Sequence, residues 1–115
     1  MEQLNSVALR GIIGSVRVQD IQDRKVANFT VATNFAFKGR DGEAIIETTW
    51  HNVTAWSGGK TADLANLQKG QCVEVQGRLR NQRYTSSDGT ERSSVDILAR
   101  EVKVIDDRLT MESGL

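Results

Sequence analysis

Apolar and polar residues alternate along most of this chain, which is the pattern of strands that have one buried face and one exposed face. The clearest example runs from Ala44 to Trp56, where β-branched and aromatic residues follow one another without Gly or Pro. Four further stretches show similar patterns, and polar or glycine-containing residues separate them. The expected strands are Val7 to Val18, Val26 to Phe37, Ala44 to Trp56, Gln71 to Arg80 and Ser93 to Ile105.

The breaks between these stretches predict how the strands connect. Polar residues at 19–25 predict a turn, and glycine-containing segments at 38–43 and 86–89 predict the tips of two hairpins. Between the third and fourth strands the apolar spacing becomes helical. We therefore expect a short helix over 61–69, ended by Gly70.

Irregularities inside two strands point to a closed barrel. Gly11 and Gly14 permit the first strand to coil or bulge, and a change of phase near Arg100 predicts a bulge in the fifth. Three strands, one short helix and two strands are the layout of the five-stranded Greek-key barrel called the OB fold. We predict an all-β domain over residues 1–105, followed by a short, disordered end at 106–115.

Composition excludes several classes of function. The 115 residues suit one domain, and no apolar run approaches the roughly 20 residues that span a bilayer. The first residues lack the features of a secretory signal, so we expect a cytoplasmic protein without membrane contact. Cys72 is the only cysteine and His51 the only histidine, and no nucleophile, base and orienting group stand out together. We expect no metal, no cofactor and no enzymatic activity.

Two tryptophans in the third strand give the first indication of a ligand. Strand alternation places Trp50 and Trp56 on one face, roughly 20 Å apart, with the polar Asn52 and Thr54 between them. Large rings separated by hydrogen-bonding groups suit single-stranded nucleic acid, because every base can stack on a ring. Ordinary core indoles with satisfied N–H groups would explain the same pattern.

Cations accompany aromatic residues in both expected hairpins. The first set is Phe37, Lys38 and Arg40, and the second is Arg78, Arg80, Arg83 and Tyr84. Arg78 and Arg80 share a strand face and are suited to a phosphate backbone. Solvated arginines on a hairpin are the plain alternative. Since the net charge is zero, such local clusters have to carry any attraction to a polyanion, and their coincidence with the rings favours nucleic-acid binding.

Several short motifs resemble the bacterial single-stranded DNA-binding protein (SSB) family over about residues 5 to 105. They are Asn5 to Gly11, Val26-Ala-Asn-Phe-Thr-Val-Ala-Thr33, Glu47-Thr-Thr-Trp-His51, Lys69-Gly70, Val73 to Gly77 and Gly77-Arg-Leu-Arg80. The resemblance implies an OB fold, a homotetramer, and sequence-nonspecific binding of single-stranded DNA in replication, recombination and repair, with association to the nucleoid.

The resemblance also implies roles for individual residues. Bases would stack on Phe37, Trp50, Trp56 and Tyr84, and the backbone would contact Lys38, Arg40, Lys69, Arg80 and Arg83. His51 matches a histidine at the family's subunit contact. The family usually continues into a flexible linker and an acidic tail that recruits replication and repair enzymes. Residues 106–115 do not resemble that tail, which fits either a truncated product or a short family member and leaves those partners in doubt.

Two other functions fit an OB barrel. A PriB-type accessory protein of replication restart would be dimeric rather than tetrameric. An oligosaccharide-binding or scaffolding domain would use the same barrel for another partner.

Overall fold

A computed structural model of the chain describes residues 2–58, 60–61 and 63–105. Its long strands are β1 (Val7–Ile21), β2 (Arg24–Lys38), β3 (Ala44–Trp56), β5 (Cys72–Thr85) and β6 (Glu91–Ile105). The expectation of a disordered end concerns residues 106–115, which lie outside the described part of the chain.

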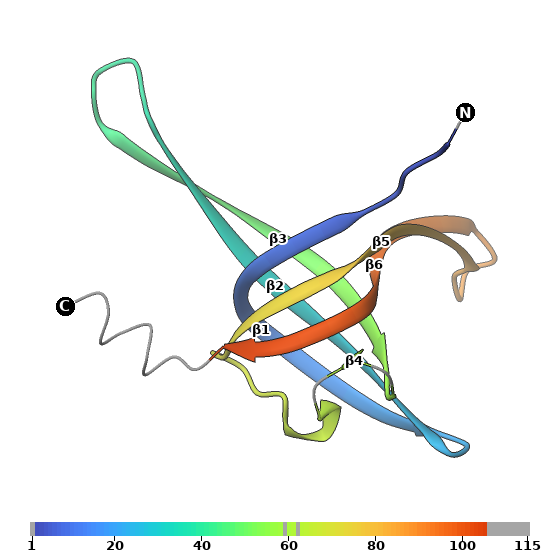
Figure 1. The fold of residues 1–115 in the computed structure, drawn as a ribbon. Coiled ribbons are helices and arrows are strands. Elements are labelled where there is room, and N and C mark those ends of the chain that lie inside the picture. The colour runs from blue at the N-terminus through green and yellow to red at the C-terminus, as the bar shows by residue number, and fades with distance from the viewer. Residues whose placement is uncertain (1, 59, 62, 106–115) are drawn as a thin grey trace.

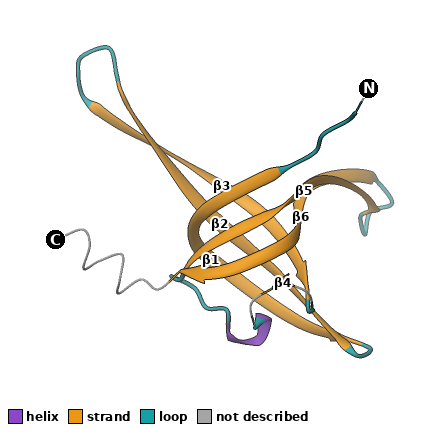
Figure 2. Cartoon of the chain, viewed as in Figure 1, coloured by secondary structure: helices purple, strands orange, loops and turns teal. Residues whose placement is uncertain are grey.

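The five long strands form a closed barrel (Figure 1). Their order is β3-β2-β1-β5-β6 with antiparallel neighbours, and a short parallel contact between β3 and β6, at Val53 and Ile97, closes the ring. Figure 2 shows that strand dominates the described residues. The all-β, five-stranded prediction is confirmed.

The core of the barrel is made by every second residue of the strands. The largest fully buried side chains are Ile13, Val31, Val53, Val73 and Val75. Side chains on either side of each of these residues point to the opposite face, because the side-chain period of a strand is two. The alternation in the sequence therefore separates core positions from the outer surface.

Bulges occur at both predicted places. The register of β1 against β2 shifts between Ile13 and Val16, beside Gly14. Arg100 is the extra residue of β6, because Gln76 pairs with Glu101 whereas Gly77 pairs with Ala99. Extra residues of this kind bend a strand and increase its twist, which a small closed barrel needs.

The predicted helix over 61–69 is wrong in extent. Thr61 belongs to a two-residue strand, β4 (Lys60–Thr61), and the helical part is a single 3₁₀ turn, η1 (Leu64–Asn66). Leu64 and Leu67 are both buried and three residues apart, which matches the period of a 3₁₀ turn, and Leu67 already has extended backbone angles. Among the described residues, no helix is long and apolar enough to cross a membrane.

Two hairpins reach beyond the barrel. The β2–β3 hairpin forms a long arm, paired as far as Lys38 and Ala44, and its end stands clear of the other strands in Figure 1. The β5–β6 hairpin is paired as far as Thr85 and Glu91. The cation and aromatic sets noted in the sequence are distributed over these hairpins, so their placement depends on which face of each strand a residue occupies.

Candidate nucleic-acid interface

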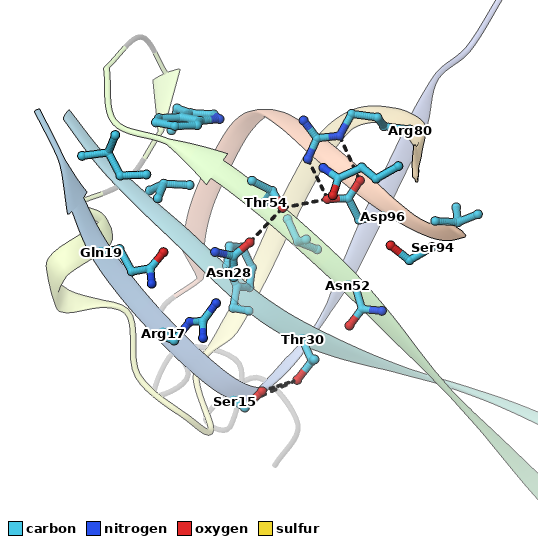
Figure 3. Close-up of a pocket in the computed structure, with 17 residues that line it drawn as sticks. Ser15, Arg17, Gln19, Asn28, Thr30, Asn52, Thr54, Arg80, Ser94 and Asp96 are labelled. Atoms are coloured by element: carbon cyan, nitrogen blue, oxygen red, sulfur yellow. Dashed lines mark hydrogen bonds and ion pairs between the residues drawn. The ribbon is translucent and has the colours of Figure 1, made fainter. Parts of the chain in front are cut away.

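A groove of about 560 Å³ lies where side chains of β1, β2 and β3 meet the inner part of the β5–β6 hairpin. Most of its polar lining is neutral, with hydroxyl and amide groups from five strands (Figure 3). These neutral residues are Ser15, Gln19, Asn28, Thr30, Asn52, Thr54, Gln82 and Ser94. Such groups both donate and accept hydrogen bonds, which suits the edges of nucleobases.

Trp56 lines this groove and is partly buried. The guanidinium carbon of Arg24 lies 5.0 Å from the centroid of its ring, and Arg24 also donates from Nη2 to the Ser57 carbonyl at 3.3 Å. A cation over an aromatic face is attracted by the ring quadrupole and holds the ring in place. Trp56 is therefore an anchored ring at the wall of a polar groove rather than a core indole.

Arg80, Asp96 and Thr54 form a charged network along one side of the groove, where Figure 3 labels them. Arg80 donates to Asp96 through Nε to Oδ1 at 3.1 Å and through Nη2 to Oδ2 at 2.8 Å. Thr54 donates its hydroxyl hydrogen to Asp96 Oδ2 at 2.7 Å. Burial by itself would raise the pKa of Asp96, but the hydrogen bonds from Arg80 and Thr54 and the charge of Arg80 outweigh it and lower the pKa.

Trp50 is 59 % exposed and is not part of the groove lining, but its ring and the groove residue Thr30 both approach Gly14. It pairs with Ala32 across β2, and its six-membered ring reaches as far as Gly14 on β1. A Cβ built on Gly14 would lie 2.2 Å from Trp50 Cζ3 and 3.0 Å from Thr30 Oγ1. The bulge glycine therefore leaves the space that this ring occupies. By strand alternation, Trp50 and Trp56 share one face of β3, as the sequence predicts.

Phe37 does not join the tryptophans. It pairs with Ile45, and alternation along β2 and β3 places both on the face opposite to Trp50. Its ring lies 6.1 Å from that of Phe35, centroid to centroid, at the outer end of the arm. Lys38 and Arg40 are exposed at the same end of the arm. Base stacking on Phe37 stays a prediction. It would require the bound nucleic acid to cross to the other face of the arm.

The residues of the second set are likewise dispersed. Tyr84 is 50 % exposed and has the same strand parity as Arg80, whereas Arg83 points the other way and lies 3.9 Å from Glu91. Arg78 is exposed beside Asn5 and Arg100, beyond the groove.

Two remaining predicted residues lie elsewhere on the molecule. Lys69 is exposed in the turn that precedes β5. His51 has the strand parity opposite to Trp50, and its Nε2 is 2.9 Å from Thr33 Oγ1. A role of His51 at a subunit contact stays a prediction.

Several groove residues were not singled out from the sequence, above all Arg17, Asn28, Thr30 and Asp96. Asn28 and Thr30 lie between buried residues of β2, which was an available signal, whereas Arg17 lies between partly buried residues and Asp96 follows the exposed Val95. The register of the second hairpin is one residue away from what a tip at 86–89 predicts: the loop is 86–90, so Thr85 pairs with Glu91 and Arg80 with Asp96, whereas the predicted tip would pair Arg80 with Val95. What the sequence does not show is which faces of different strands meet around one groove.

Comparison with known sequences identifies one family. The model of the single-strand binding protein family matches residues 4–105. The single-stranded DNA-binding protein of Neisseria meningitidis serogroup B is 37 % identical over 116 residues, which cover 96 % of this chain and 65 % of that protein. The mitochondrial single-stranded DNA-binding protein of Drosophila melanogaster is 30 % identical over 101 residues, covering 86 % and 69 %. This chain thus spans about two thirds of the length of such relatives.

Two solved structures have the same fold. The Plasmodium falciparum SSB in complex with single-stranded DNA superposes with a TM-score of 0.73 at 23 % identity, covering 92 % of this chain and 98 % of that one. A deletion variant of the single-stranded DNA binding protein from Thermus aquaticus gives 0.72 at 25 % identity, covering 91 % and 52 %. The first of these likenesses concerns the fold alone.

Proposed function

The chain belongs to the single-strand binding protein family, and we propose on this basis that it binds single-stranded DNA without sequence preference and without catalysing a reaction. The observation that carries the proposal is the combination of two tryptophans on one face with a groove of neutral hydrogen-bonding groups. Stacking on Trp50 and Trp56 tolerates any base, and amide and hydroxyl groups adapt to different base edges.

Positive charge outside the groove would hold the backbone of a strand that continues past this surface. Lys38 and Arg40 on the arm, Lys69 before β5, and Arg78 and Arg83 on the second hairpin are all exposed and available to phosphates. Contact with each phosphate releases condensed counterions, so affinity should fall as salt rises. The number of phosphates that these cations contact sets the steepness of this dependence, at about 0.7 in the slope of log K against log salt for each contact.

The cellular role follows from the same proposal. A protein that covers unpaired strands acts where they arise, namely in replication, recombination and repair, and in the cytoplasm beside the nucleoid. Assembly as a homotetramer, with His51 near a subunit contact, is part of the proposal. A PriB-type dimer remains the competing assembly.

Titration with a dT oligomer tests binding directly. Quenching of most of the tryptophan emission is expected on binding, with affinity that declines in salt. A neutral glycan of similar size is the control ligand, because it has no counterions to release. Light scattering on the same samples separates four chains from two. Unchanged emission at saturating dT, or binding of the glycan alone, would refute the proposal.

A further inference from the structure

An ion pair occupies part of the groove in which bases would lie. The side chains of Arg80 and Asp96 are only 26 % and 12 % exposed, and both line the groove. Two guanidinium nitrogens of Arg80 contact the two carboxylate oxygens of Asp96, which is the bidentate geometry of a strong charge-assisted pair. Thr54, itself buried, fixes the carboxylate from the β3 side.

This arrangement removes Arg80 from the set of available cations. Its charge is compensated at 2.8 Å, and a phosphate that approached it would meet the Asp96 carboxylate at the same place. The remaining charged residue in the lining is Arg17, which is exposed and lies at the opposite end of the groove in Figure 3. Like charges brought close together in a partly dry groove repel strongly.

We propose that Asp96 is a specificity-determining residue, which holds Arg80 in an ion pair and so makes this end of the groove accept nucleobases and exclude backbone phosphates. The inference rests on the proposed binding of single-stranded DNA. It also assigns which side of the bound strand faces the groove. The bases are turned toward Thr54 and Asn52, and the phosphates are turned outward to Arg17 and the exposed cations.

The salt dependence of binding shows how many phosphates the protein contacts, and therefore whether Arg80 contacts one. For single strands, the slope of log K against log salt changes by about 0.7 for each phosphate that a cation contacts. Asp96→Asn keeps an oxygen for Thr54 and Arg80 but removes the compensating charge. We expect it to let Arg80 reach a phosphate and to steepen the slope for a dT oligomer by about 0.7.

Three further variants complete the test. Asp96→Asn combined with Arg80→Gln should restore the wild-type slope. Arg80→Gln alone should keep that slope, whatever happens to affinity at one salt concentration, and it tests the proposal even if Asp96→Asn folds poorly. Glu74→Gln is the matched control, because it also removes one negative charge and releases an arginine, Arg10, but lies outside the groove lining. Its slope should stay at the wild-type value.

Different results would overturn different statements. A slope that is unchanged in Asp96→Asn, or steepened equally in Glu74→Gln, would refute the role of Asp96. A slope that Arg80→Gln alone reduces by about 0.7 would show that Arg80 already contacts a phosphate in the wild-type complex. Each of these results leaves the proposed function intact. Failure of the wild-type chain to bind dT would refute the proposed function and the inference with it.

Discussion

Replacing Gly14 by alanine should weaken DNA binding without unfolding the barrel. The added Cβ would lie 2.2 Å from Trp50 Cζ3, whereas ordinary contact begins at 3.4 Å, so the ring edge has to retreat by roughly 1 Å. Trp50 is 59 % exposed and can move outward. Gly14 does not have a positive φ, so alanine is allowed there. The loss of chain entropy in the unfolded state would even favour the variant by about 0.4–1 kcal/mol.

The expected loss of affinity follows from the value of one stacked base. Stacking on an aromatic ring contributes about 1–3 kcal/mol, which corresponds to a factor between about 5 and 150 in affinity. A displaced ring should lose part of this free energy, and Trp50→Ala sets the upper limit. Gly11→Ala is the informative contrast, because its Cβ would lie 2.2 Å from the Ala32 carbonyl oxygen. Backbone cannot swing aside, so that variant should lose stability instead.

The assay combines thermal unfolding with fluorescence titration by a dT oligomer. Trp50 and Trp56 are the only tryptophans, so a Trp56→Phe background reports Trp50 alone. Gly14→Ala in that background should unfold near the temperature of its parent, show altered Trp50 emission before DNA is added, and bind less tightly. Parental emission together with parental affinity would refute the argument that Gly14 positions Trp50. A loss of affinity that is fully explained by the fraction of unfolded protein would also refute it.

Three other predictions test separate parts of the structure. Phe37→Ala should weaken dT binding less than Trp50→Ala, because Phe37 lies on the other face of the arm; an equal loss in fluorescence titrations would contradict this placement. Asn5→Ala removes two hydrogen bonds to the Leu79 backbone, at 2.8 and 2.9 Å, and should cost about 1–2 kcal/mol in urea unfolding, with faster exchange of the Leu79 amide. Because folding lowers the pKa of Asp96, its ionised form stabilises the protein fully above the ordinary value of 3.8, and this contribution is lost as pH falls through the folded pKa. The unfolding free energy of Asp96→Asn should therefore fall less at acid pH than that of the wild type. Parallel curves of unfolding free energy against pH for the two proteins would contradict this expectation.

Much of the barrel could be predicted from alternation alone. The tips of both hairpins, the bulge near Gly14 and the bulge at Arg100 follow from local rules, because each depends on residues close in sequence. The helix over 61–69 could not be delimited in this way. Leu64 and Leu67 belong to the buried core cluster, and such packing against distant strands is a tertiary effect that the local sequence does not show.

The candidate site was less accessible to sequence reasoning. Trp50 and Trp56 share a face because they lie in one strand, and this holds in any register. The face of Phe37 relative to Trp50 depends instead on how β2 pairs with β3, and a shift of one residue would reverse it. Aromatic residues that are near one another in sequence therefore need not form one surface.

The charge of the groove also could not be predicted by counting charged residues along the sequence. Arg80 looks like a phosphate-binding residue when cations are counted along the chain, yet 16 residues later Asp96 compensates it. With a net charge of zero and this pair in the lining, long-range attraction contributes little at the centre of the site. In the proposed complex, affinity there would come from stacking on Trp50 and Trp56 and from hydrogen bonds to base edges. The exposed cations on the arm and hairpins would then hold the phosphates, so raising the salt concentration should weaken the cation contacts while stacking on the two tryptophans persists.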